Sequence, residues 1–155
     1  MLKQDIELKP AECDLSSLVA ATLKEFKSNL KADLQQNLQP VPKARIDSAQ
    51  IHKVLTNLVM NANEAVNGHG VIQVSTIHDG NTVGFAVRDN GCGMSEEFIE
   101  KSLFRPFQTT KKRGLGIGLF HSKLIVEAHR GTLEVNSAVG AGTEFRVILP
   151  LGSDT

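Results

Sequence analysis

The chain has 155 residues with a formal net charge of zero, and 41% of them are hydrophobic, which suits one globular domain with a single core. The balanced charge and the absence of Trp and Tyr argue against nucleic-acid binding, which needs a basic surface and favours aromatic stacking. Cys13 and Cys92 form no CxxC pair, and no apolar run is long enough to span a bilayer. We therefore expect a cytoplasmic domain, with membrane anchoring left open for a longer parent chain.

The first third of the chain predicts a strand, a helix and two further short strands. The strand is expected at residues 6–8 and is closed by Pro10. Asp14 predicts the N-cap of a helix, because apolar residues recur at helical spacing after it. These residues are Leu15, Leu18, Val19, Leu23, Phe26 and Leu30. Residues 34–46, with two prolines in the middle, predict two short strands joined by an extended loop.

A second helix is predicted after Asp47 and carries two stripes. The apolar stripe consists of Ile51, Val54, Leu55, Leu58, Val59, Ala62 and Val66. Beside it stand Asn57, Asn61 and Glu64, spaced so that they line one edge of that face. Asn is a mediocre helix former, so the presence of two Asn residues in the middle of this helix needs an explanation. A magnesium-bound phosphate group is one, because Mg²⁺ takes oxygen ligands; a solvated helix edge is the alternative.

An antiparallel hairpin is predicted next and delivers a carboxylate to a glycine turn. Gly68 and Gly70 end the helix, and residues 71–77 and 82–89 then pair around an Asp-Gly-Asn turn. Asp89 ends the second strand, and an ionised carboxylate accepts hydrogen bonds only, so it can bind an amino group such as that of adenine. Gly91 and Gly93 let the backbone approach a flat ligand. The alternative is a simple strand-ending turn.

The last third predicts a short helix, a lid, a long helix and a closing hairpin. Ser95 opens the short helix, and residues 104–116 combine basic residues with glycines, as expected of a lid that is mobile without nucleotide. The glycines open a helix whose free N–H groups can bind an anion; a solvated basic loop is the alternative. The apolar face of that helix is predicted as Ile117, Phe120, Leu124, Ile125 and Ala128. His129 is expected at its end without a metal, and residues 132–136 and 143–149 form the hairpin.

Five motifs together resemble the N, F and three glycine boxes of sensor histidine kinase catalytic domains, in that family's order and spacing. They are Asn57-Leu58-Val59-Met60-Asn61-Ala62, Asp89-Asn90-Gly91-Cys92-Gly93, Phe104-Arg105-Pro106-Phe107 with Thr109-Thr110-Lys111, Gly114-Leu115-Gly116-Ile117-Gly118-Leu119, and Gly142-Thr143-Glu144-Phe145. The F box is most similar to that of nitrogen-regulation sensor kinases. The resemblance implies an α/β two-layer sandwich of the Bergerat type, with a mixed, mainly antiparallel sheet, helices on one face and an ATP lid.

The resemblance also implies ATP and Mg²⁺ as ligands and assigns residues to them. Asp89 would bind the adenine amino group with help from Thr143, Asn61 would ligate Mg²⁺, and Asn57 and Lys111 would act at the phosphates. The remaining nucleotide-binding residues that it implies are Glu64, Gly91, Gly93, Met94, Thr109, Thr110, Gly114, Gly116, Ile117, Gly118 and Leu119. Catalysis would then be phosphoryl transfer by positioning and charge stabilisation.

One departure from the family shapes the expected domain organisation. Of the five His, only His78 is followed directly by an acidic residue, Asp79, as the family's phosphoacceptor is, and His78 falls at the predicted hairpin turn and not in a helix, so we expect the acceptor on a separate dimerisation hairpin. Residues 1–14 would be the connection to that hairpin, 15–150 a monomeric catalytic domain and 151–155 a tail. A response regulator receiver domain is the implied downstream partner. A smaller departure is Arg130, where the family usually has Gly.

Three other functions are compatible with parts of the pattern. Related gyrase, mismatch-repair and chaperone ATPases hydrolyse ATP with a Glu at the position of Asn57, and an amide cannot be a general base. Stand-alone serine kinases that bind sigma factors match the length but lack the Phe-Pro-Phe box. A non-catalytic ATP-binding docking module also stays open.

Overall fold

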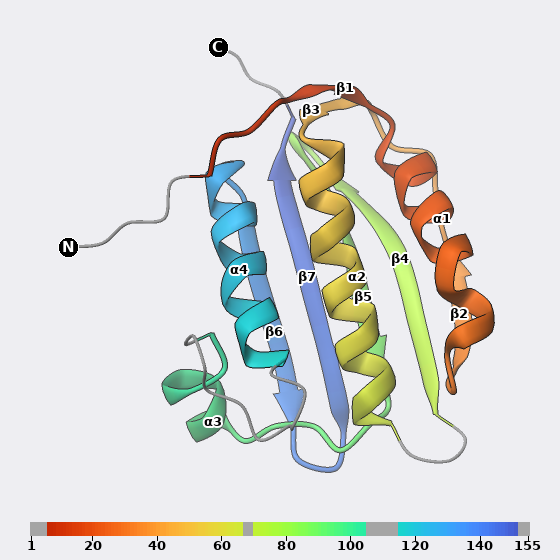
Figure 1. Cartoon of the computed structure of the whole chain (residues 1–155), viewed down its shortest axis with the longest axis vertical. Helices are drawn as coiled ribbons and strands as arrows, with labels where there is room; N and C mark the ends of the chain where they lie inside the picture. The colour runs from red at the N-terminus through yellow and green to blue at the C-terminus, as the bar shows by residue number, and fades with distance from the viewer. Residues whose placement is uncertain (1–5, 67–69, 105–114, 152–155) are drawn as a thin grey trace.

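The computed structural model describes residues 6–66, 70–104 and 115–151, and its centre is a five-stranded sheet (Figure 1). The strand order is β2-β4-β5-β7-β6, in which β2 is parallel to β4 and the other neighbours are antiparallel. The strands are β2 (Asp33–Asn37), β4 (Val71–Asp79), β5 (Thr82–Asp89), β6 (Thr132–Ala138) and β7 (Gly142–Pro150). Both predicted hairpins and the predicted mixed, mainly antiparallel sheet are confirmed.

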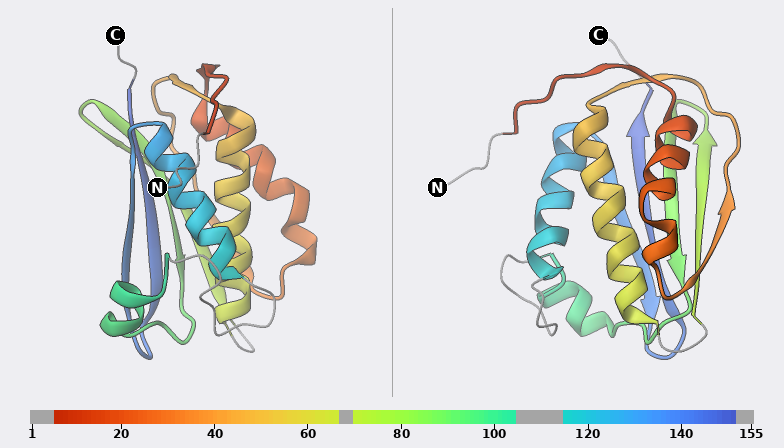
Figure 2. Two further views of the ribbon diagram at one scale, coloured as in Figure 1. Left: turned by 60° about the vertical axis from the view of Figure 1, so that its left-hand side comes forward. Right: turned by 45° about the vertical axis from the view of Figure 1, so that its right-hand side comes forward.

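Three long helices cover one face of this sheet and give the molecule two layers (Figure 2). They are α1 (Leu15–Phe26), α2 (Ser48–Ala65) and α4 (Leu115–Ala128), with α2 between the other two. A 3-10 turn, η1 (Lys27–Asn29), follows α1, and α3 (Glu96–Lys101) lies at the end of the sheet. A separate two-stranded ribbon joins β1 (Ala11–Cys13) to β3 (Ala44–Ile46). Among the described residues, no helix is long and apolar enough to cross a membrane.

Each of the three predicted N-caps is confirmed by a hydrogen bond. The Asp14 carboxylate accepts from the Ser17 N–H at 3.4 Å, and that of Asp47 accepts from the Gln50 N–H at 3.2 Å. The Ser95 hydroxyl accepts from the Phe98 N–H at 3.1 Å. These side chains satisfy N–H groups that have no partner within the helix, so the helix starts are fixed locally by the sequence.

The core lies between the sheet and α2. All seven residues of the predicted α2 stripe are buried, as are Val83, Phe85 and Val87 on alternate positions of β5. Because the side chains of a strand alternate between two faces, this places Asp89 on the helix-covered face, where it is 5% exposed. The core thereby holds both the carboxylate and the polar edge of α2 at fixed positions.

One prediction of local structure is wrong, one is partly wrong, and a third is shifted. The first strand is Ala11–Cys13 and follows Pro10, since the ribbon pairs Ala11 with Ile46 and proline has no N–H to donate. The predicted apolar face of α4 is right in part: Ile125 is buried and Phe120 and Leu124 are half-buried, but Ala128 is exposed, and Leu119, Ser122 and Val126 are buried outside the predicted face. Helix α2 ends at Ala65, because the backbone of Val66 is already extended. This end is earlier than the one predicted at Gly68 and Gly70, and Gly68 itself lies outside the described residues.

Candidate functional site

The elements that carry the predicted N box and the first and third glycine boxes meet at one end of the sheet, the lower end in Figure 1. The C-terminal end of α2, the end of β5 and the start of β7 meet there, and α4 also begins on this side. Segments far apart in the sequence therefore share one site, because antiparallel β5 and β7 bring the Asp89 turn beside the β6–β7 turn.

Asp89 is the buried carboxylate of this site. It lies opposite Thr143 in the β5–β7 register, and both side chains are buried, at 5% and 6% exposure. The Asp89 Oδ1 atom accepts from the Gly91 N–H at 2.7 Å, so the turn considered as the alternative is present. That turn fixes the carboxylate and does not exclude ligand binding, because a carboxylate offers about four acceptor sites.

The glycine turn after Asp89 is clamped between α2 and the β6–β7 turn. The Cys92 N–H donates to the Ala65 carbonyl at 3.2 Å, and the Gly140 N–H donates to the Cys92 carbonyl at 2.7 Å. A Cβ atom on Gly91 would lie 2.4 Å from that same Ala65 oxygen, so close packing against α2 requires glycine there. The first and third predicted glycine boxes are also in direct contact, because a Cβ atom on Gly142 would lie 2.1 Å from the Asp89 carbonyl oxygen.

Ser137, on β6, is a site residue that sequence analysis missed. Its hydroxyl accepts from the Met94 N–H at 2.8 Å and donates to the Gly142 carbonyl at 2.9 Å. It also lies 2.7 Å from the Thr143 hydroxyl. The only sequence signal is its polar place beside Thr143 across the predicted hairpin, which does not reveal the contact with Met94.

The polar edge of α2 faces α4 in part. Asn57 is half-buried and its Nδ2 group donates to the Ser122 hydroxyl of α4 at 3.2 Å. Asn61 is 9% exposed, and Glu64 is half-buried. Ser122 is fully buried and was not predicted, since a lone serine in an apolar helix carries no signal of its partner.

The donor set of this edge fits Mg²⁺ together with a phosphate. Amide and carboxylate oxygens are the hard ligands that Mg²⁺ prefers, and it usually completes its shell with water and substrate phosphates. Within the described residues, no group of three or more His, Cys, Asp or Glu stands ready to hold a metal ion. The side chains present would therefore suffice only if the ion arrived with a phosphate ligand.

The opposite end of α2 is fixed by a buried Asp–His contact. The Asp47 N–H donates to His129 Nε2 at 3.0 Å, and His129 Nδ1 lies 2.9 Å from the Ile125 carbonyl. Burial raises the pKa of Asp47, but the N–H groups of Lys9 and Gln50 and the nearby His129 outweigh it and hold the pKa below its usual value. His129 was expected at the helix end, and the structure places it there but buried, where it joins the end of α4 to the start of α2.

The predicted lid falls largely outside the described residues. The predicted site residues outside the described part of the chain are Thr109, Thr110, Lys111 and Gly114. Only the backbone is described for Gly116, Ile117 and Gly118, which lie in the first turns of α4. Leu119 is buried in the core. Leu103, just before the lid, is also buried, and the ring centroid of Phe104, the first lid residue, lies 5.0 Å from the ammonium nitrogen of Lys123 on α4.

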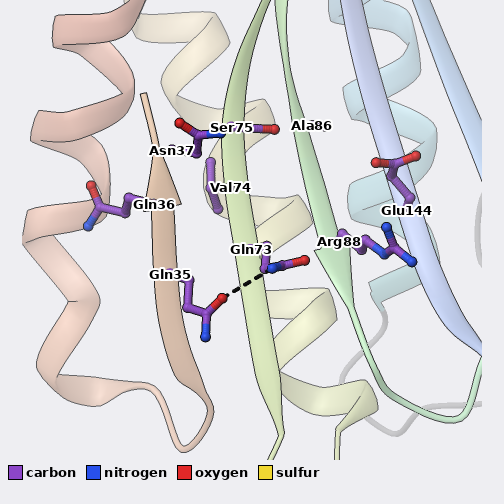
Figure 3. A pocket seen from close by; sticks show the side chains of 9 residues that line it. All are labelled: Gln35, Gln36, Asn37, Gln73, Val74, Ser75, Ala86, Arg88 and Glu144. Carbon is purple, nitrogen blue, oxygen red and sulfur yellow. Dashed lines mark hydrogen bonds between the residues drawn. The ribbon is translucent and has the colours of Figure 1, made fainter. Parts of the chain in front are cut away.

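A shallow pocket of about 260 Å³ lies on the sheet face away from the helices (Figure 3). Gln35, Gln73, Ser75, Ala86, Arg88 and Glu144 contribute to its lining. The Gln73 amide donates to the Gln35 side-chain oxygen at 3.1 Å. None of the predicted site residues lines this pocket, and Asp89 faces the other layer, so the pocket is separate from the candidate site.

Comparison with known proteins agrees with this geometry. The family model "Histidine kinase-, DNA gyrase B-, and HSP90-like ATPase" matches residues 46–153. Sensor histidine kinase ZraS of Escherichia coli O157:H7 is 39% identical over 111 residues, or 72% of this chain and 24% of that protein. Signal transduction histidine-protein kinase AtoS of Escherichia coli K12 is 35% identical over 121 residues, covering 77% of this chain and 19% of AtoS.

A solved structure shows the same architecture. The nucleotide-free catalytic domain of histidine kinase ThkA has a TM-score of 0.83 and 28% identity, covering 93% of this chain and 97% of that domain. The chain spans about a quarter or less of the length of ZraS and AtoS. The similarity to nitrogen-regulation kinases stays a prediction. Because the family model covers most of the chain and the fold agrees, the chain belongs to the family of histidine kinase-, DNA gyrase B- and HSP90-like ATPases.

Proposed function

We propose that this chain is the ATP-binding catalytic domain of a two-component sensor histidine kinase. The observation that carries the proposal is the buried Asp89 carboxylate, held opposite Thr143 at the end of the sheet where α2 presents Asn61. A carboxylate accepts hydrogen bonds only, which suits the amino group of adenine. The relatives ZraS and AtoS are named as histidine kinases, which supports this choice within the family.

The phosphates would lie between α2 and the start of α4. Asn61, with Asn57 and Glu64 near it, would hold a Mg²⁺ ion that arrives with ATP, and this ion would neutralise phosphate charge. The first turn of α4 has free N–H groups that suit an anion, and Lys111 with Thr109 and Thr110 would contact the phosphates from the lid. Asp89, Gly91, Gly93, Met94 and Thr143 would surround the base.

The chemistry would be transfer of the γ-phosphoryl group to a histidine and not to water. Asn57 cannot take up a proton near neutral pH, so it is no general base for hydrolysis. Positioning and charge stabilisation are sufficient when an imidazole nitrogen supplies the nucleophile in line. The acceptor would be a histidine on a dimerisation hairpin and the next partner a receiver domain, all in the cytoplasm, with the isolated domain as a monomer.

Phosphoryl transfer can be tested by adding a histidine-bearing dimerisation hairpin from a related sensor kinase as a separate polypeptide. With γ-labelled ATP and Mg²⁺, we expect acid-labile label on the hairpin, and none when its histidine is replaced by glutamine. The Asp89→Asn variant should transfer label more slowly at limiting ATP. Acid-stable label would indicate a serine kinase, and release of phosphate without labelling would indicate a hydrolase. Nucleotide binding with neither label nor phosphate release would indicate a docking module. Any of these three outcomes would overturn the proposal.

A further inference from the structure

The Ser137 hydroxyl has more polar neighbours than it has protons, and this fixes the direction of each hydrogen bond. A hydroxyl offers one proton and two lone pairs. The Gly142 carbonyl at 2.9 Å can only accept, so it takes the Ser137 proton. The Met94 N–H at 2.8 Å can only donate, so it occupies one lone pair.

The second lone pair of Ser137 faces the Thr143 hydroxyl at 2.7 Å. Because the Ser137 proton is already used, Thr143 must be the donor in this contact. The Thr143 oxygen then keeps only lone pairs for other partners. It lies on β7 between Ser137 on β6 and Asp89 on β5, and its side chain shares the helix-covered face with that of Asp89.

Asp89 and Thr143 therefore form a row of acceptors at the end of the sheet. Such a row matches a ligand edge that carries donors, such as the amino group of a 6-aminopurine. A 6-oxopurine would place its carbonyl oxygen against acceptors and leave it without a partner. If the Thr143 proton were free to rotate, Thr143 would donate to that oxygen and the discrimination would weaken.

We propose that Ser137 is a specificity-determining positioning residue, which holds the Thr143 proton away from the bound base and so enforces selection of 6-amino over 6-oxo purine nucleotides. The inference rests on the proposed function, since it assumes that the base binds beside Asp89. Ser137 itself contacts neither the base nor the phosphates in this assignment.

The test measures the affinities of ADP and IDP, which differ at the purine 6-position, for the wild type and four variants: Ser137→Ala, Ser137→Thr, Thr143→Val and the double variant Thr143→Val with Ser137→Ala. We expect Ser137→Ala to lower the ratio of ADP affinity to IDP affinity by about three- to tenfold, the worth of one hydrogen bond. Ser137→Thr retains the hydroxyl and should retain most of the wild-type ratio. In a Thr143→Val background, the Ser137→Ala change should leave the ratio unaltered.

Each other outcome has a distinct meaning. Equal weakening of ADP and IDP by Ser137→Ala would mean that Ser137 only braces the Met94 turn, which overturns the inference but not the proposed function. A further fall of the ratio in the Thr143→Val background would overturn it as well, because the effect would not pass through Thr143. If the wild type bound neither nucleotide, the proposed function would fail first. Should Ser137→Ala not fold, the nearly isosteric Ser137→Cys, a weak hydrogen-bonding group, repeats the test with the same expected fall, and an unchanged ratio overturns the inference.

Discussion

The Asp89 side chain accepts from the Gly91 N–H and, in the proposed function, also binds adenine, and one substitution can separate these two roles. Asp89→Asn keeps an oxygen that can accept from the Gly91 N–H, now at 2.7 Å, but removes the negative charge. A charge-assisted hydrogen bond contributes about 1.5–3 kcal/mol, so ADP affinity should fall by roughly ten- to a hundredfold and the preference for ADP over GDP should narrow. Competition binding measures both quantities. Equal ADP and GDP affinities in the wild type would reduce Asp89 to a turn residue.

Asn61 is the residue on which the predicted magnesium dependence rests. It is 9% exposed on the edge of α2, and an amide oxygen is a suitable Mg²⁺ ligand. We expect Asn61→Ala to abolish the gain in ATP affinity that Mg²⁺ gives, with little effect on affinity measured in EDTA. Calorimetric titration of ATP with and without Mg²⁺ measures these affinities for the wild type and the variant. Asn63→Ala is a control on the same helix, since the Asn63 side chain accepts from the N–H groups of Lys31 and Ala32. If both variants lost the Mg²⁺-dependent gain in ATP affinity equally, the role of Asn61 would be structural.

At the scale of single elements, both α2 and α4 were predicted as helices, but the buried face was predicted in full for α2 and only in part for α4. The apolar residues of α2 alternate with polar ones at a clear helical period, so its buried face was predicted in full. In α4, apolar residues surround the helix, and its buried polar residues find partners on α2. Ser122 contacts Asn57 and His129 contacts Asp47, both far away in the sequence, so no local pattern announces them.

Arg130, which follows the end of α4, has a strained backbone conformation that a substitution could relieve. This residue has a φ of 63°, while the Gly131 N–H bonds to the Val126 carbonyl and the Arg130 N–H bonds to the Glu127 carbonyl, as in a Schellman motif. A left-handed conformation costs a non-glycine residue about 1–2 kcal/mol, partly offset by the unfolded-state entropy of glycine. Arg130→Gly should therefore stabilise the fold by about 0.5–1 kcal/mol in urea unfolding. Arg130→Ala, which removes the side chain but not the strain, should give no such gain.

The N-cap of α2 should make stability depend on pH. The pKa of Asp47 is lowered in the folded state, so its carboxylate contributes stability above its ordinary pKa of about 4, and this contribution is lost as the pH falls below that value. Asp47→Ala should cost about 1–2 kcal/mol at pH 7, and the difference from wild type should shrink below about pH 4. Urea unfolding from pH 7 to pH 3 measures this. Asp14→Ala is the matched control, and a smaller loss is expected because its cap is exposed and longer, at 3.4 Å.

At the scale of the whole molecule, the site depends on contacts that join distant parts of the chain. The sequence motifs predicted Asp89 and Thr143 of the proposed base site, but the strand order β5-β7-β6 determines how they are arranged. That order places Thr143 between Asp89 and Ser137, and it lets Ser137 on β6 bond to Met94 and the β6–β7 turn bond to Cys92. Spacing within a motif cannot specify such a contact, because it depends on how whole strands pair.

The close approach of the two glycine turns gives the last prediction. Gly93 has a φ of 74°, and a Cβ atom there would lie 1.9 Å from the Ala138 carbonyl oxygen, whereas Gly140, with a φ of 82°, has nothing within 4 Å of its Cβ position. Both Ala variants incur the left-handed cost of about 1–2 kcal/mol, but Gly93→Ala must also push the turns apart, for a total of roughly 2–4 kcal/mol. Because that displacement acts on the turn that follows Asp89, Gly93→Ala should also weaken ADP binding, while Gly140→Ala should not. Urea unfolding and ADP titration of both variants provide the comparison. Equal losses of stability would show that the turns are not in contact in solution, and the base site would then have to be formed by β5 and α2 alone.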